Sequence, residues 1–121
     1  MILKKNKYKA KRTAGYDSKA EHDYGEYILR PMEKAGEISN LKKQDSVELI
    51  PGINWKVDFS YEVDGVKVYE EYKGFETVDY KLKLKLWKLF GPATLKIIKG
   101  VYPRFVVKQV IPAGRYKVIK A

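Results

Sequence analysis

The sequence predicts a single α/β domain in which helices flank a mixed β-sheet, with a β-hairpin added at the C-terminal end. The length supports one domain, because 121 residues suffice for one hydrophobic core. Helical patterns over about 18–35 and 80–90 enclose strand patterns, and further strand patterns follow the second helix. The chain has no cysteine, so this core and not disulfide bonds must hold the fold together.

The first fifteen residues are expected to form a flexible basic arm, ahead of a domain over 16–121 with its core at about 16–101. They include few apolar residues, so they have no core of their own. The arm carries six basic side chains: Lys4, Lys5, Lys7, Lys9, Lys11 and Arg12. Two roles stay open for it: contact with nucleic-acid phosphates, which releases counterions, or a solubilising tail.

A first helix is expected from about Ser18 to Ala35. Ser18 and Glu21 have the spacing of a capping box, and apolar residues follow at helical intervals as far as Gly36. Pro31 lies inside this segment and lacks a backbone N–H, so we expect a kink or an early break there. Two roles stay open for Glu21, as the capping partner of Ser18 or as an acid of a functional site.

The Asp64-Gly65 dipeptide lies between two runs of alternating apolar residues and predicts a β-hairpin. A two-residue turn there pairs Val63 with Val66, and counting back along both strands places Asp58 opposite Glu71. Cross-strand partners have Cβ atoms roughly 4.5 to 5.5 Å apart, and like charges at that distance destabilise a sheet. A divalent cation between the two acids would remove this penalty.

Period-two alternation then sorts the side chains of the hairpin. Asp58 shares its face with Glu71 and Lys73, and a face that is simply solvated explains this pattern equally well. Glu70 breaks the pattern on the apolar face, so we expect it near an edge. The apolar face is expected to carry Val57, Phe59, Tyr61, Val63, Val66, Val68 and Tyr72.

The segment 80–90 alternates leucine and lysine as a strand would, yet we expect a helix. Leucine and lysine are strong helix formers, Thr77 can cap the start, and Gly91-Pro92 is a common helix end. On this helix a basic stripe forms, and a further lysine falls within the apolar arc and is expected to point towards the site. The stripe consists of Lys81, Lys85 and Lys88, and the further lysine is Lys83.

The remaining strands are weaker predictions. Val47 to Ile50 is expected to be the first strand, after a loop over 38–44. Thr94 to Val101 is expected to be the strand that follows the second helix. Residues 102–121 are expected to form an appended hairpin that turns at Pro112-Ala113-Gly114.

The charge balance indicates a polyanionic partner. Twenty-five basic and fifteen acidic side chains leave a formal charge of +10. Nucleic acid is the leading candidate, and an anionic membrane surface is the competitor. No apolar run approaches the ~20 residues of a spanning helix, and the N-terminal residues lack the apolar core of a signal peptide, so we expect a cytoplasmic protein without a membrane partner.

Any metal in this protein is expected to have oxygen ligands. The chain has no cysteine and a single histidine, His22, which excludes the usual zinc sites. Carboxylates favour Mg²⁺ or Mn²⁺.

The order of the acidic residues resembles the PD-(D/E)xK nuclease superfamily. Glu21 is on a first helix, Asp58 on a strand and Glu71-Tyr72-Lys73 on the next strand, with Val57 where the nominal motif has proline. The spacing is similar to that of the endonuclease I family of phage Holliday-junction resolvases, over about residues 10–100. Small phage proteins of this superfamily share Ser18-Lys19-x-Glu21, 34–41, Gln44, Asp58-Phe59, Lys73-Gly74 and Thr77.

This resemblance implies a restriction-endonuclease-like core and a Mg²⁺-dependent endonuclease that cuts branched DNA. Asp58 and Glu71 would bind Mg²⁺ together with the backbone carbonyl of Tyr72, and Glu21 would complete the set. Lys73 would orient or deprotonate the attacking water, or neutralise charge on the phosphate. A resolvase cuts two strands symmetrically, so the resemblance also implies a homodimer, active in the host cytoplasm if the protein is phage-encoded.

The basic residues would supply the DNA contacts of such an enzyme. The candidates are Lys4, Lys5, Lys7, Lys9, Lys11, Arg12, Lys19, Lys81, Lys83, Lys85 and Lys88.

Two other functions stay open. The first is an exonuclease or a nonspecific nicking nuclease with the same chemistry. The second is a noncatalytic basic nucleic-acid-binding protein, a class in which aromatic rings between lysines stack on single strands. The rings in question are Tyr8, Tyr16, Tyr69, Tyr72, Tyr80 and Tyr102.

Overall fold

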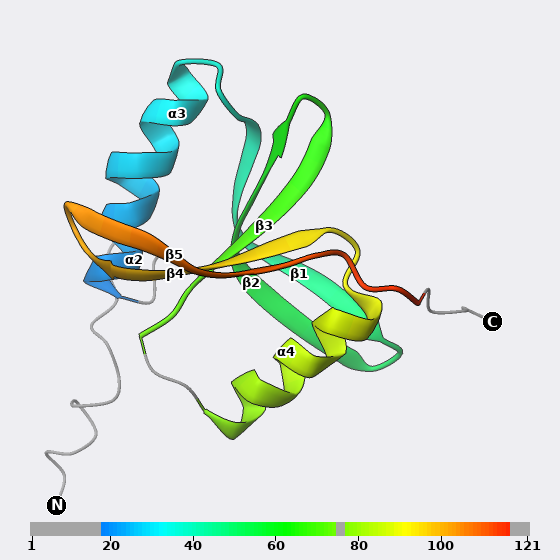
Figure 1. The fold of residues 1–121 in the computed structure, drawn as a ribbon. Helices are drawn as coiled ribbons and strands as arrows, with labels where there is room; N and C mark the ends of the chain where they lie inside the picture. Colours follow the sequence, from blue (N-terminus) through cyan, green and yellow to red (C-terminus); the bar gives the residue numbers. More distant parts are fainter. Residues whose placement is uncertain (1–17, 75–76, 117–121) are drawn as a thin grey trace, which may run out of the picture.

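Over its described residues, the protein is an α/β fold with a five-stranded mixed sheet and two helices (Figure 1). The computed structural model describes residues 18–74 and 77–116, so the expected basic arm lies outside the described residues. The strands and the second helix are β1 (Ser39–Ile50), β2 (Ile53–Val63), β3 (Val66–Tyr72), α4 (Val78–Phe90), β4 (Thr94–Val101) and β5 (Arg104–Ile111).

The strands are arranged in sequence order, β1-β2-β3-β4-β5. Neighbours are antiparallel except β3 and β4, which are parallel and are joined by α4. A parallel pair needs a crossover of this kind, because its second strand must start again at the same end of the sheet. The predicted order of helix, three strands, helix and strand is confirmed.

The two helices cover opposite faces of the sheet. Tyr69 of β3 packs in a core cluster with Trp87 of α4, whereas its neighbour Val68 packs against a second cluster that includes Leu29 of the N-terminal helix. Neighbouring residues of a strand point to opposite faces. The sheet is therefore buried on both sides over its central strands.

The N-terminal helix continues through its proline. Its three consecutive pieces are α2 (Lys19–Tyr24), the π-helical turn η1 (Gly25–Leu29) and α3 (Arg30–Lys34). The Ser18 hydroxyl accepts the backbone N–H of Glu21, as the capping box predicts. Pro31 lies in the first turn of α3, where a missing N–H is tolerated, and the π turn comes directly before it. The early break that the proline indicated is absent.

The β2–β3 turn has the predicted register. Val63 pairs with Val66, and both turn residues, Asp64 and Gly65, have positive φ angles of 51° and 82°. These angles are those of the two-residue turns that match the twist of antiparallel strands.

The second helix is also confirmed. The Thr77 hydroxyl accepts the backbone N–H of Tyr80 and caps α4. At the other end the helix stops at Gly91, where an added Cβ would lie 2.3 Å from the indole of Trp87. Glycine is required there because the buried Trp87 ring occupies the space of a side chain.

The first strand is longer than expected. The predicted loop over 38–44 is mostly strand, since β1 begins at Ser39. Two residues of this segment, Asn40 and Gln44, have φ angles of 54°, which L-residues adopt rarely. These two residues turn the backbone locally without ending the pairing with β2. The alternation of apolar and polar residues does not predict a strand that contains such turns.

Within the described residues, the predicted C-terminal hairpin over 102–121 differs from the structure. Residues 104–111 pair with β4, with Val101 opposite Arg104, so the hairpin is β4–β5. The following segment satisfies the end of α4 instead: the N–H of Gly114 donates to the Gly91 carbonyl and that of Tyr116 to the Leu89 carbonyl, both at 2.9 Å. The last carbonyls of a helix lack hydrogen-bond donors within the helix, and this segment supplies two such donors. Residues 117–121 lie outside the described part.

The predicted faces of β2 are also wrong. Val57 packs with Trp55 in the cluster beneath α4, whereas Phe59 and Tyr61 pack in the cluster beneath the N-terminal helix. Strict alternation would place all four on one face, so the pattern breaks near Asp58. The pairing register places this break opposite the positive-φ residue of β1, at 44.

Candidate active site

Beyond the last backbone pair of β2 and β3, side-chain hydrogen bonds of Asp58 and Glu71 connect the two strands. Backbone pairing of β2 with β3 reaches Phe59 and Glu70. Beyond it, Asp58 Oδ2 accepts the backbone N–H of Tyr72 at 2.9 Å, and Glu71 Oε1 accepts the backbone N–H of Asp58 at 3.0 Å. The two acids therefore lie together where the register predicts, each with one oxygen fixed by the backbone.

A glutamine joins this pair to the helix. The side-chain nitrogen of Gln44 lies 3.0 Å from Glu21 Oε2 and 3.3 Å from Asp58 Oδ1. Glu21 is buried, with 3% of its surface exposed, and its carboxylate faces the sheet and its acids. The Ser18 hydroxyl accepts the backbone N–H of Glu21, and the Glu21 carboxylate accepts the Gln44 amide, so this position is compatible with both roles left open for Glu21.

The environment of Glu71 disfavours its charged form. Burial raises the pKa of Glu71 to about 8, and the negative charge of Glu21 acts in the same direction. The Asp58 N–H, the Lys73 ammonium and a hydrogen bond from Trp55 oppose this rise but do not cancel it. The site is therefore short of positive charge, which a cation would supply.

Lys73 lies directly after β3, on the Glu71 side of the site. Its backbone N–H donates to the Ile98 carbonyl at 2.8 Å and fixes the chain there. Its ammonium nitrogen lies 3.9 Å from the centre of the Tyr80 ring, within the range of a cation–π contact. Helix α4 thus holds the lysine whose charge acts on Glu71.

The donor chemistry of the site fits a hard cation, although the ligands are not assembled. Glu21, Asp58 and Glu71 offer the carboxylate oxygens that Mg²⁺ and Mn²⁺ prefer. In the described part of the chain, however, no three acidic or histidine side chains gather closely enough to hold a metal ion. The amide of Gln44 lies between two of these carboxylates, so it would have to turn or move for a cation to bind both.

Glu70 is not near an edge, as alternation indicated. It lies in β3, the central strand, is 3% exposed, and accepts hydrogen bonds from the hydroxyls of Tyr24 and Tyr61. Burial raises the pKa of Glu70 against the effect of these two bonds. Sequence reasoning missed this network, and the only signal was an acid within an apolar strand.

The lysines predicted to bind DNA have different surroundings. The lysines and the arginine of the arm lie outside the described residues. Lys19 pairs with Asp23 at 2.8 Å, and Lys83 pairs with Asp79 at 3.2 Å within its own helix, which does not support the expected direction towards the site. The stripe of Lys81, Lys85 and Lys88 is exposed.

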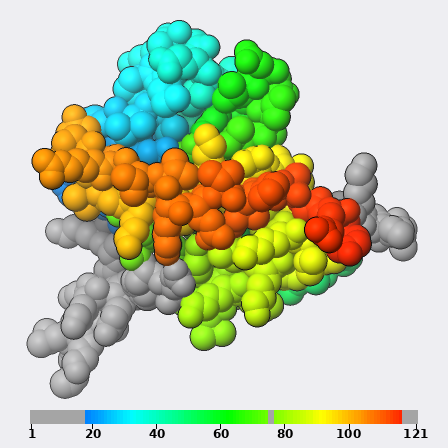
Figure 2. Space-filling model, viewed as in Figure 1, coloured from blue at the N-terminus to red at the C-terminus, as the bar shows by residue number. Residues whose placement is uncertain are grey.

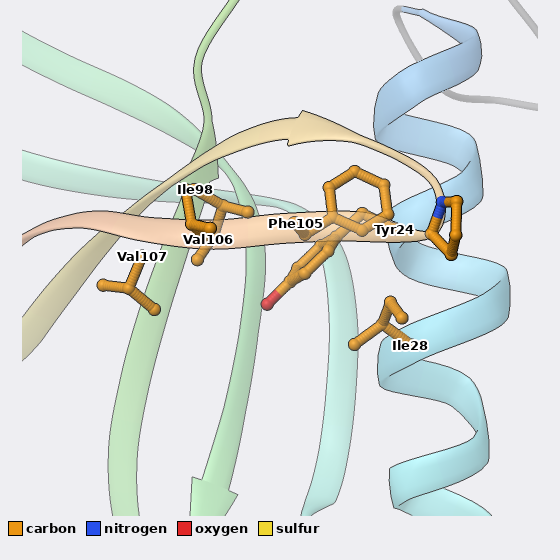
Figure 3. A pocket seen from close by; sticks show the side chains of 7 residues that line it. Tyr24, Ile28, Ile98, Phe105, Val106 and Val107 are labelled. Carbon is orange, nitrogen blue, oxygen red and sulfur yellow. The ribbon is translucent and has the colours of Figure 1, made fainter.

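An apolar groove of about 190 Å³ lies between the N-terminal helix and the β4–β5 hairpin (Figure 3). It is lined by Ile28, Ile98, Phe105, Val107 and the ring of Tyr24. Ligand pockets usually reach about 300–1,000 Å³ and contain several converging polar groups. The hydroxyl of Tyr24 is already bound to Glu70, so the groove lacks the chemistry of an active site.

No helix in the described ranges combines the length and the apolar composition that crossing a membrane requires. Comparison with known proteins does not assign the chain either: no protein-family model, no curated protein and no solved structure matches it. The residues of the site are therefore the basis for assigning a function.

Proposed function

We propose that this protein is a metal-dependent endodeoxyribonuclease of the PD-(D/E)xK type, with a restriction-endonuclease-like core. One observation carries the proposal: carboxylates from a helix and two strands meet through Gln44 and the strand backbone, with a lysine beside them. Acidic side chains that hold a metal ion, with a lysine beside them, can support phosphodiester hydrolysis by a metal-activated water.

The chain's own residues have distinct tasks in this mechanism. Asp58 and Glu71 each keep one oxygen on a backbone N–H, which orients the other oxygen for a cation. Glu21 and the Tyr72 carbonyl would add further oxygen ligands. Bound Mg²⁺ would supply positive charge for the phosphate and acidify a water molecule. Lys73 would orient that water or stabilise charge on the phosphate.

Branched DNA is the proposed substrate. A charge of +10 and the exposed stripe of Lys81, Lys85 and Lys88 would bind phosphates without reading sequence. A protein that contacts only backbones selects its substrate by shape, which suits junctions. Symmetric cutting of a junction requires two active sites, so we propose a homodimer that acts in the cytoplasm.

A second candidate function is noncatalytic binding of nucleic acid. The absence of a preassembled group of three ligands among the described residues favours it. An exonuclease or a nicking enzyme would use the same acids and differs only in how DNA reaches them.

The experiment compares cutting of a four-way junction, a linear duplex and a single strand, with Mg²⁺ or EDTA. Asp58→Asn and Lys73→Ala should abolish cutting. The matched controls Asp64→Asn, in the exposed turn, and Lys56→Ala, on the exposed side of β2, should cut like the wild type. No cutting by the wild type, or equal cutting by the site variants, would reject the site. Junction binding without cutting would favour the noncatalytic function.

A further inference from the structure

A row of aromatic rings leads away from the site over the surface. The His22 and Tyr27 rings have centroids 6.0 Å apart, and the Tyr27 and Tyr102 rings have centroids 5.0 Å apart. His22 follows the candidate acid Glu21 directly in α2, so the row begins on the same helix as that acid. Tyr27 is 52% exposed and Tyr102 is 50% exposed, far more than a tyrosine of the core.

This exposure separates the two rings from the other described tyrosines that the sequence left as candidates for stacking. Tyr69 and Tyr80 are buried at 8% and 6%, and Tyr72 donates its hydroxyl to the Gly100 carbonyl at 2.6 Å. Only exposed rings can stack on a ligand. Among the described tyrosines that the sequence left as candidates, Tyr102 is therefore the one that can stack on a base. Tyr27, which is equally exposed, can do the same.

The β4–β5 hairpin extends the row into an apolar surface. Figure 2 shows β5, in orange to red, lying across the surface of the molecule. Its Val106, Val107 and Val110 are 60%, 51% and 56% exposed, and Val106 and Val107 line the groove of Figure 3. Exposed apolar residues gathered in this way usually mark a binding surface.

Charge indicates the kind of partner. No acidic residue follows Asp79 in the sequence, and the hairpin carries Lys96, Lys99, Arg104 and Lys108. A second copy of the same hairpin would bring like charges together, whereas a polyanion would be attracted. Single-stranded nucleic acid offers both the phosphates for these charges and the unpaired bases for the rings, while a duplex keeps its bases stacked.

We propose that Tyr27, Tyr102 and the β4–β5 hairpin bind single-stranded nucleic acid. Bases stack on the two tyrosine rings, and phosphates contact basic side chains of the hairpin. This surface is distinct from the proposed nuclease site, and binding to it requires no cleavage. On a branched substrate it would receive an unpaired strand next to the acids.

The test measures binding of a fluorescent oligothymidylate and of a duplex of equal length, by anisotropy, with EDTA present. Tyr27→Ala and Tyr102→Ala should each weaken single-strand binding roughly ten-fold and duplex binding much less. Tyr102→Phe should bind like the wild type, because stacking needs the ring and not the hydroxyl. The control is Tyr116→Ala, since Tyr116 is 54% exposed and has a ring contact with Phe90 at the end of α4.

Wild-type binding by Tyr27→Ala and Tyr102→Ala would overturn the proposal, and so would an equal loss in Tyr116→Ala. Vesicles of phosphatidylserine and phosphatidylcholine test the lipid alternative: if Tyr102→Ala loses vesicle binding but keeps single-strand binding, the partner is a membrane. Self-association that is lost in Tyr102→Ala would assign the surface to a second copy. Asp58→Asn should bind the single strand as the wild type does. A failure of the nuclease proposal can therefore be distinguished from a failure of the single-strand proposal.

Discussion

The hydroxyl of Tyr24 donates a hydrogen bond to the buried carboxylate of Glu70 and thereby joins the helix of the candidate site to its sheet. Tyr24 lies three residues after Glu21, and Glu70 directly precedes Glu71. Tyr61 donates to the same carboxylate from β2. One buried acid thus connects the three elements that carry the three candidate catalytic acids, although it does not face their site.

Tyr24→Phe should destabilise the fold. The substitution keeps the ring but leaves the buried Glu70 carboxylate with one donor fewer, which costs about 1–3 kcal/mol of unfolding free energy. Urea unfolding at constant pH measures this change, and Tyr27→Phe is the control because Tyr27 is exposed. Equal stability of Tyr24→Phe and the wild type would show that the bond does not fix the helix.

The stability of the protein should depend on the charge of Glu71. Since burial raises the folded-state pKa to about 8, the folded protein keeps a proton that the unfolded chain has released, from near pH 4.5 upwards. The unfolding free energy should therefore fall as the pH rises from about 4.5 to about 8. Glu71→Gln removes this loss and should be more stable than the wild type at pH 9, by roughly 1–3 kcal/mol, while it no longer cuts DNA.

Calorimetry of both proteins between pH 5 and pH 9 checks this prediction. The control is Glu62→Gln, the same substitution on the same hairpin at a half-buried position. A Glu71→Gln protein that is less stable than the wild type at pH 9 would mean that the carboxylate has a structural role.

The β2–β3 turn and helix α4 could be predicted from the sequence, because each depends on residues that are close together in the chain. The Asp64-Gly65 turn sets the register that brings Asp58 to Glu71, and it needs only its two positive φ angles. Helix α4 forms in spite of its alternating leucines, because Thr77 caps its start and glycine follows its end. Both features can be read within a few residues of the chain.

The β4–β5 turn is also local, because only Tyr102 and Pro103 separate Val101 from its partner Arg104, but the prediction placed the turn at Pro112-Ala113-Gly114. The other features depend on contacts between distant segments. The break in alternation near Asp58 lies opposite Gln44, from another strand, whose left-handed backbone is unusual for glutamine. Glu70 is tolerated in a central strand only because two tyrosines reach it from other elements.

Gln44→Ala should have opposite effects on the stability of the metal-free protein and on its stabilisation by Mg²⁺. In the metal-free protein the variant leaves Glu21 and Asp58 without the amide donor, which should lower the unfolding free energy by about 1–3 kcal/mol. With the competing amide removed, Mg²⁺ should bind more tightly and raise the melting temperature by more than in the wild type. Thermal unfolding with EDTA and with increasing Mg²⁺ measures both effects.

Gln109→Ala, on β5, is the matched control and should respond to Mg²⁺ as the wild type does. A smaller Mg²⁺ response in Gln44→Ala would show that the side chain is itself a ligand, through its carbonyl oxygen. No Mg²⁺ response in the wild type would argue against the metal site as a whole.

The lysine stripe of α4 should set the salt dependence of DNA binding. If Lys81, Lys85 and Lys88 each contact a phosphate, the triple alanine variant releases three counterions fewer on binding duplex DNA. The slope of log K against log salt concentration should then become shallower by roughly 0.9 for each lost contact. Anisotropy titrations from low to moderate salt, with EDTA to prevent cutting, measure this slope. A triple variant of the exposed Lys34, Lys42 and Lys56 removes the same charge elsewhere and should change the slope much less, so equal changes in both would assign the effect to net charge and not to the stripe.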